Sequence, residues 1–177
     1  LKIIHEGGKI VAGDSALIVE KATATTILLT AATSFNGFDK SPVQEGKDPS
    51  ALTTKMMSIA AQQPYSKLLA HHVADYSTIY RRVSYELGKS ILPDLPTDAR
   101  LKKMADEFDP QLLSTLVQYG RYLIIASSRP GGQPANLKGL WNEKLRPEYS
   151  ANWCLDHDAQ MFYYPVETNN LSEMHEP

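Results

Sequence analysis

The amino-acid pattern changes near residue 40, and this change decides the fold class that the chain can adopt. Residues 1–38 contain runs of Ile, Leu, Val and Thr, above all over 23–33, separated by turn signals such as Gly7-Gly8. Beyond residue 50, apolar residues return every three or four positions, which is the helical spacing. We therefore predict an α+β chain in which the last strands of one domain precede the first helices of another.

Four helices are expected in the second part of the chain. They cover residues 50–63, 65–87, about 98–107 and 110–128. Ser50 and Thr97 are the expected caps of the first and third helices, and Gly88 should end the second. The fourth follows Asp109-Pro110, a cap and first-turn pair. Because this last helix is apolar on nearly every side, we expect it to be buried between other helices.

The composition excludes several classes of protein. The 18 Lys and Arg against 20 Asp and Glu give a net charge of −2, whereas nucleic-acid proteins usually carry a basic surface. Hydrophobic residues make up 42% of the 177 residues, enough to bury a core. No apolar run approaches the roughly 20 residues that span a bilayer. The one cysteine, Cys154, allows no disulfide within the chain.

The two ends of the sequence predict a piece of a longer protein. The chain begins Leu1-Lys2 without an initiator Met and stops at Pro177, directly after a polar cluster. Any targeting signal is then expected outside this sequence.

Two carboxylates stand two residues apart in Asp156-His157-Asp158. They would diverge by about 200° on a helix and share a face on an extended segment. Paired carboxylates carry out glycoside hydrolysis, although its acid and base normally come from distant positions. Helix capping and surface charge are the alternative interpretation. A metal site with Cys154 is disfavoured, because the spacing matches no standard zinc pattern.

Aromatic side chains gather after the polar loop 127–136. Trp141 and Trp153 are suited to stack on a sugar ring, whose C–H faces are apolar, and core packing is the alternative. Aromatic and amide side chains on loops over a helical scaffold commonly bind ligands.

A series of motifs resembles one known family. The motifs are Gly120-Arg121-Tyr122-Leu123, Ser127-Ser128-Arg129-Pro130-Gly131, Pro134-Ala135-Asn136-Leu137-Lys138-Gly139-Leu140-Trp141-Asn142, Gln160-Met161 with Tyr163, and Asn170-Leu171-Ser172-Glu173. In this order they resemble the glycoside hydrolase family 95 α-L-fucosidases. With the upstream motifs Glu6-Gly7-Gly8, Thr33-Ser34-Phe35 and Pro96-Thr97-Asp98, the resemblance covers essentially the whole chain.

The resemblance implies a domain organisation. Members of the family have an N-terminal β-sandwich, a helical linker, a catalytic (α/α)6 barrel and a C-terminal β domain. Residues 1–40 would be the last strands of the β-sandwich, 41–107 the linker with its helices, and 108–177 the first part of the barrel.

The resemblance also implies an activity. The family releases terminal α-L-fucose, typically α-1,2-linked, with inversion, and related members act on α-L-galactosides. The implied substrate is a fucosylated oligosaccharide or glycan, with no cofactor, and the implied location is secreted or periplasmic. No nucleic acid and no membrane span are expected, and the other implied partner is the rest of the parent chain.

The family's catalytic machinery extends beyond this sequence. Its acid, a glutamate, and a later aspartate fall after Pro177, so the chain alone is expected to be inactive. Two family asparagines, in an Asn-x-Asn segment before Gln-Met, help to activate water, and Asp156 and Asp158 stand there in this sequence. They are the implied base or water-positioning residues.

Four further residues are implied to bind the substrate: Trp141, Asn142, Trp153 and His157. The change from amide to carboxylate at Asp156 and Asp158 leaves three outcomes open. The protein uses an aspartate directly as the base, acts on a different sugar such as an α-L-galactoside, or binds carbohydrate without catalysis.

Overall fold

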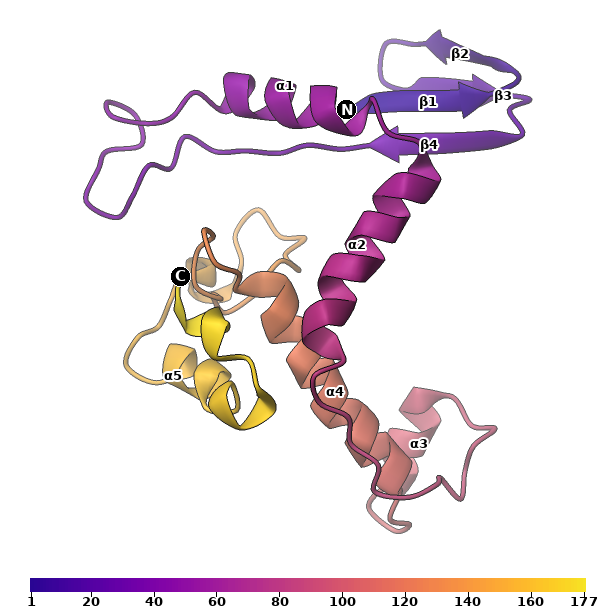
Figure 1. Cartoon of the computed structure of the whole chain (residues 1–177), viewed down its shortest axis with the longest axis vertical. Coiled ribbons are helices and arrows are strands. Elements are labelled where there is room, and N and C mark those ends of the chain that lie inside the picture. The colour runs from indigo at the N-terminus through magenta and orange to yellow at the C-terminus, as the bar shows by residue number, and fades with distance from the viewer. The chain divides into compact units, whose positions relative to one another are not determined.

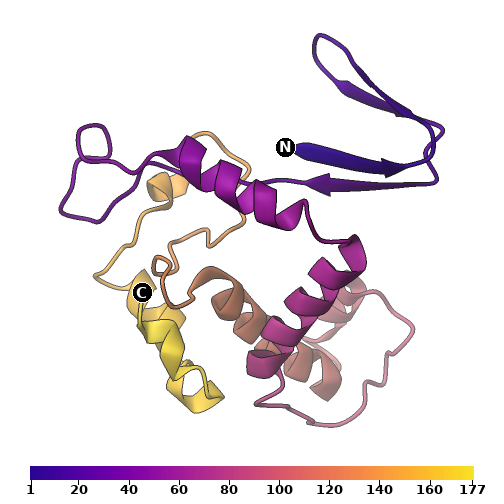
Figure 2. The same ribbon diagram turned by 45° about the horizontal axis from the view of Figure 1, so that its top comes forward.

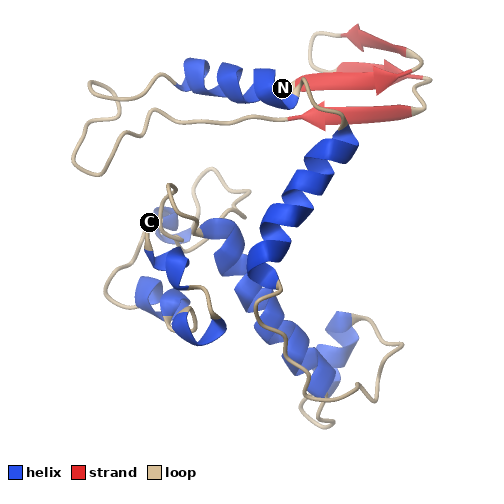
Figure 3. Ribbon diagram, viewed as in Figure 1, coloured by secondary structure: helices blue, strands red, loops and turns tan.

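The computed structural model describes all residues from 1 to 177 (Figure 1). The chain divides into two compact units, Leu1–Val73 and Ala74–Pro177, and each is described by itself. The boundary falls within a helix. The chain is thus an α+β chain with all its strands before residue 29 (Figure 3).

The first unit contains four short strands in two antiparallel pairs. They are β1 (Lys2–Glu6), β2 (Lys9–Ala12), β3 (Leu17–Glu20) and β4 (Ala24–Leu28). β1 pairs with β4 from Lys2 opposite Leu28 to Glu6 opposite Ala24, and β2 pairs with β3. Gly7 and Gly8, both with φ of 66°, turn the chain between β1 and β2. A Cβ on Gly8 would lie 2.2 Å from the Glu20 carbonyl oxygen, so this turn requires glycine.

The expectation of a strand over 23–33 is confirmed only in part. β4 ends at Leu28, where the pairing with β1 also ends, and residues 29–33 have no regular secondary structure. A β-rich composition does not form a strand without a partner for its backbone groups.

The first predicted helix is found as α1 (Pro49–Ala60). Its cap is Asp48 and not Ser50, because the Asp48 carboxylate accepts a hydrogen bond from the backbone N–H of Ser50 at 2.8 Å. The second predicted helix begins at Tyr65, as α2 (Tyr65–Tyr80).

The second unit contains the end of α2 and three further α-helices: α3 (Thr97–Lys103), α4 (Pro110–Ser127) and α5 (Asp158–Tyr163). Three 3-10 turns complete it, over Glu148–Ala151, Glu167–Asn169 and Ser172–His175. Figures 1 and 2 both show the C-terminal turns, in yellow, beside the C-terminal part of α4. α3 is shorter than expected, and Pro96 occupies the cap position predicted for Thr97.

The prediction that α2 continues to Gly88 is wrong, and a buried arginine explains the early end. The Arg121 guanidinium, on α4, donates to the carbonyl oxygens of Ile79, Tyr80 and Val83 at 3.4, 2.9 and 3.0 Å. A helix that continued to Leu87 would use all three of these oxygens for its own hydrogen bonds. Arg121 is 3% exposed, and its positive charge suits the negative end of the α2 dipole.

The start of α4 is confirmed as predicted. Asp109 caps it by accepting from the Leu112 N–H at 3.0 Å, and Pro110 is in the first turn. The buried Asp109 carboxylate also accepts from Arg100 at 2.8 and 3.0 Å and from Ser90 at 2.8 Å. Hydrogen bonding by Arg100, the largest cause, holds the pKa of Asp109 well below its usual range.

The core of the second unit lies between α4 and the C-terminal turns. Its fully buried members are Ile125, Val166, Leu171 and Met174. The expectation that α4 is buried on all sides is wrong for this chain, because Leu116 and Tyr119 are each 54% exposed. As for membranes, none of the helices combines the length and the apolar character needed to cross one.

Candidate functional site

The Asp156-His157-Asp158 segment leads into α5, so it is neither fully helical nor fully extended. Asp156 lies exposed in the preceding turn, and Asp158 is the half-buried first residue of the helix. His157, with φ of −152° and ψ of −63°, breaks the regular backbone between them. The first turn of a helix favours an acidic side chain, so Asp158 also stabilises α5.

Cys154 lies close to the carboxylates of Asp156 and Asp158. Burial is the main cause that raises the pKa of its thiol, and the nearby carboxylates of Asp158 and Asp156 raise it further. The thiol donates to the Asn152 side-chain oxygen at 2.9 Å. A thiol with a raised pKa is a poor nucleophile. The structure also shows no group of three His, Cys, Asp or Glu residues able to hold a metal ion.

Trp141 lines a largely apolar pocket of about 330 Å³ beside α4. Its ring lies 5.7 Å from the Tyr122 ring and remains 46% exposed, so it is open to a ligand. Gly139, with φ of 55°, lies under the ring: a Cβ there would be 3.0 Å from two ring carbons. Phe162, on α5, lines the same pocket.

Asn142 and Trp153 are engaged in local hydrogen bonds. The Asn142 amide donates to the Lys144 carbonyl oxygen at 2.9 Å and accepts from the Lys144 N–H at 3.2 Å, which closes a turn. The Trp153 indole N–H donates to the Pro134 carbonyl oxygen at 2.8 Å, and the residue stays 38% exposed. Hydrogen bonds from Lys138 and Lys144 lower the pKa of Glu148. The two lysines also form ion pairs with Glu148, which hold the loop between Asn142 and Trp153.

The structure therefore does not bring all the sequence-predicted site residues into one site. Asp156, His157 and Asp158 form one group with Cys154, and Trp141 belongs to a pocket that neither aspartate lines. α5 connects the groups, because it carries Asp158 at its first residue and Phe162 near its end.

The residue at the end of α5, Tyr163, belongs to a hydrogen-bond network that no sequence pattern signals. The Tyr163 hydroxyl lies 2.6 Å from the Ser128 hydroxyl and accepts from the Ala135 N–H at 2.8 Å. Ser128, fully buried, donates its one hydroxyl hydrogen to the Met174 carbonyl oxygen at 2.9 Å. The Tyr163 hydroxyl is therefore the donor to Ser128. These residues lie far apart in the sequence, and no spacing pattern signals their contact.

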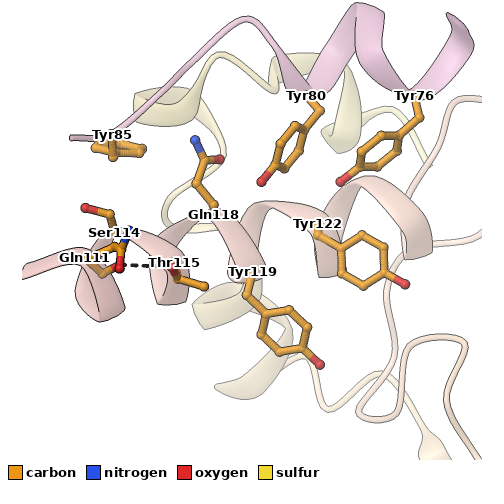
Figure 4. Close-up of a pocket in the computed structure, with 9 residues that line it drawn as sticks. All are labelled: Tyr76, Tyr80, Tyr85, Gln111, Ser114, Thr115, Gln118, Tyr119 and Tyr122. Atoms are coloured by element: carbon orange, nitrogen blue, oxygen red, sulfur yellow. Dashed lines mark hydrogen bonds between the residues drawn. The ribbon is translucent and has the colours of Figure 1, made fainter. Parts of the chain in front are cut away.

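A second pocket, of about 630 Å³, is lined by residues of α2, α4 and the segment after α2 (Figure 4). Its aromatic rings form contiguous contacts: Tyr76 lies 5.1 Å from Tyr80 and 6.2 Å from Tyr122, which lies 5.9 Å from Tyr119. Burial and the neighbouring tyrosines raise the pKa of Tyr76.

The polar side chains of this second pocket are used internally. Ser114 donates to the Pro110 carbonyl oxygen, Thr115 to that of Gln111, and the Gln118 amide to that of Val83. The pocket therefore offers mainly aromatic faces, and its polar side chains serve the packing of α4.

Comparison with known proteins identifies the class to which this arrangement belongs. The sequence model of the glycosyl hydrolase family 95 catalytic domain matches residues 64–177. Alpha-L-fucosidase 2 from Arabidopsis thaliana is 36% identical over 98% of this chain and 21% of its own length. Probable alpha-fucosidase A from Aspergillus niger is 34% identical over 75% of this chain and 17% of its own. The corresponding Aspergillus oryzae protein is 29% identical over 92% and 24%.

The chain belongs to glycoside hydrolase family 95. It spans about a fifth of the length of the curated relatives that it matches. The resemblance found from the sequence motifs is thereby confirmed at the level of the family.

Proposed function

We propose that this chain is part of an exo-acting glycoside hydrolase that releases terminal α-L-fucose, α-1,2-linked, from oligosaccharides or glycans with inversion of the anomeric centre. The observation that carries the proposal is the likeness of almost the entire chain to alpha-L-fucosidase 2 of Arabidopsis thaliana. In this account residues 1–40 end a β-sandwich, 41–107 link the domains, and 108–177 begin an (α/α)6 barrel.

Asp156 and Asp158 are the proposed water-activating residues. Inversion requires one carboxylate to remove a proton from the attacking water while an acid protonates the leaving oxygen. Asp156 is exposed and Asp158 half-buried at the start of α5, so a water molecule can reach the segment. The acid is proposed to come from a glutamate of the parent protein outside this sequence.

Asp156 and Asp158 change the electrostatics of the proposed site, because the resemblance implies amides at these two positions. An amide donates a hydrogen bond to a neighbouring carboxylate, whereas an aspartate repels it. Like charges within a few ångströms raise the pKa of one member. An aspartate here therefore acts as the base itself or as an acceptor that orients the water.

Trp141 and Trp153 are the proposed sugar platforms, because both keep exposed indole faces. His157, exposed beside the aspartates, is the proposed polar contact to the sugar hydroxyls. The Asn142 amide closes a turn, so its contribution to substrate binding is through the shape of the loop that carries Trp141.

One observation favours an alternative function. The segment that the resemblance aligns with the family's water-activating Asn-x-Asn reads Asp156-His157-Asp158 in this chain. This double change fits an enzyme for a related sugar, such as an α-L-galactoside, or a relative that binds carbohydrate without hydrolysing it.

The test is an assay of the full-length protein that carries this sequence, against a panel of fucosylated and galactosylated oligosaccharides. We expect release of L-fucose from α-1,2-linked substrates, with the β-anomer appearing first by NMR. Release of L-galactose alone establishes the related glycosidase. Binding without turnover across the panel establishes the carbohydrate-binding alternative.

A further inference from the structure

We propose that Tyr163 is a positioning residue that holds α5, and with it Asp158, in the orientation needed for water activation. The proposal rests on the function assigned above to Asp158. In this proposal the Tyr163 hydroxyl affects the reaction rate without contacting the substrate.

The Tyr163 hydroxyl joins three separate parts of the second unit. It donates to Ser128, at the end of α4, and accepts from the Ala135 N–H in the following loop, at 2.6 and 2.8 Å. Ser128 passes the connection to the C-terminal turns through the Met174 carbonyl oxygen. The ring lies 5.4 Å from the His175 ring and packs against the hydrophobic core.

The partners of Tyr163 are buried and hydrogen-bonded to their surroundings. Ser128 is fully buried and its backbone N–H bonds to the Ile124 carbonyl oxygen, so the end of α4 fixes its hydroxyl. Met174 is also fully buried. A hydroxyl held by such groups has one position, because moving it would leave buried polar groups without partners.

α5 needs this support because it is short. Its six residues form fewer than two turns, and an isolated helix of that length is unstable in water. At the first turn it is held by the buried Ala159, whose N–H bonds to the Cys154 carbonyl oxygen at 3.1 Å. At the last residue it is held by Tyr163. These two attachments determine the direction in which Asp158 leaves the helix.

The same loop connects Tyr163 to the proposed sugar platforms. Ala135, which donates to Tyr163, follows Pro134, whose carbonyl oxygen accepts from Trp153. Ala135 also lines the pocket that contains Trp141. The platforms keep contacts of their own, Trp141 with the Tyr122 ring and Trp153 with the Pro134 carbonyl oxygen. Loss of the Tyr163 hydroxyl should therefore disturb the placement of the carboxylate more than the platforms.

The test uses the full-length protein with Tyr163→Phe, which removes the hydroxyl and keeps the ring. Tyr164→Phe is the matched control, because Tyr164 is the next residue and is 71% exposed. We expect Tyr163→Phe to lower kcat by about ten- to a hundredfold, the cost of a small misplacement of a reacting group, with KM within about twofold. Tyr164→Phe should change neither constant.

Ser128→Ala and the double variant show whether the two hydroxyls act together. Because the groups share one hydrogen bond, the double variant should lose no more activity than Tyr163→Phe alone. Hydrogen exchange of the peptide 154–163 supplies a readout that needs no activity, and it should become faster in Tyr163→Phe but not in Tyr164→Phe.

A Tyr163→Phe protein that melts earlier but keeps its kcat and the exchange rate of 154–163 would overturn the proposal, since Tyr163 would then only stabilise the fold. If that variant fails to fold, the kcat and exchange of Ser128→Ala decide in the same way. Asp158→Asn separates this proposal from the one on which it rests. An unchanged rate there refutes the role of Asp158, whereas a reduced rate there with a normal Tyr163→Phe refutes the positioning role alone.

Discussion

The two units of the chain keep their structure by different means. None of the 73 residues of the first unit is buried, and Ile27, Leu29 and Phe38 are 62%, 75% and 98% exposed. The second unit has a hydrophobic core and buries Asp109, Arg121 and Ser128 with their hydrogen-bond partners. Two-stranded sheets without a core are marginally stable. The residues proposed to act on sugar all belong to the unit that has a core.

The largest expected effect on stability comes from shortening a core side chain. Ile125→Ala removes a side chain that is 1% exposed and should lower the free energy of unfolding by about 2–5 kcal/mol. Ile27→Ala, in β4, is the matched control and should change it by about 0.5 kcal/mol or less. Urea unfolding monitored by circular dichroism measures both. Equal effects would show that the two units do not differ in the proposed way.

The next effect concerns the arginine that ends α2. Arg121→Met leaves the Tyr80 carbonyl oxygen without its donor and should cost about 1–3 kcal/mol. Arg82→Met is the control: it breaks the partly exposed ion pair with Glu173, worth about 1 kcal/mol or less. If Arg121→Met unfolds at the wild-type urea concentration, the hydrogen bonds of Arg121 to the end of α2 do not stabilise the second unit.

A pH-dependent effect should appear in the second unit. The pKa of Asp109 is lower in the folded state than in the unfolded chain, where it is about 3.9. The stabilisation is therefore fully present above about pH 4 and is lost as the pH falls toward the folded pKa. Asp109→Asn should lower the melting temperature at pH 7 and weaken its fall between pH 4 and pH 2. A wild-type melting temperature independent of pH over this range would contradict the assignment.

The smallest effect is expected at Gly139. Gly139 has a φ of 55°, which is unfavourable for alanine, and a Cβ there would press against the Trp141 ring. Gly139→Ala should therefore lower the free energy of unfolding by about 1 kcal/mol. We expect a shift in tryptophan fluorescence as the ring moves. Gly131→Ala also changes a glycine with positive φ, but no atom lies near its Cβ, so the fluorescence should stay unchanged. Identical spectra for wild type and Gly139→Ala would refute the close packing.

Local signals were sufficient to predict several elements from the sequence. Asp109-Pro110 marked the start of α4 at the correct residue, and α2 begins at Tyr65 as predicted. The end of α2 could not be predicted from Gly88, because the cause is Arg121 on another helix. Residues 29–33 have strand composition but no pairing partner. In each failure, a contact distant in the sequence outweighed the local preference.

The candidate site, like the fold, could be predicted from the sequence only in part. The sequence singled out Asp156 and Asp158, but their spacing left helix and extended chain open, and the structure places the start of α5 between them. Tyr163 appeared only within a family motif and with no role, since its partners Ser128 and Ala135 are 35 and 28 residues away in the sequence. Hydrogen-bond networks between loops leave no periodic pattern.

The most direct measurement of the proposed chemistry is the rate of the full-length protein with Asp158→Asn. This change removes the charge and keeps nearly the same shape. If Asp158 is the base, kcat on an α-1,2-linked fucoside should fall by about a hundred- to ten-thousandfold. Asp98→Asn, in the first turn of α3, is the matched control and should leave the rate unchanged. An unchanged or higher kcat in Asp158→Asn, with unchanged affinity for the sugar, would contradict the account.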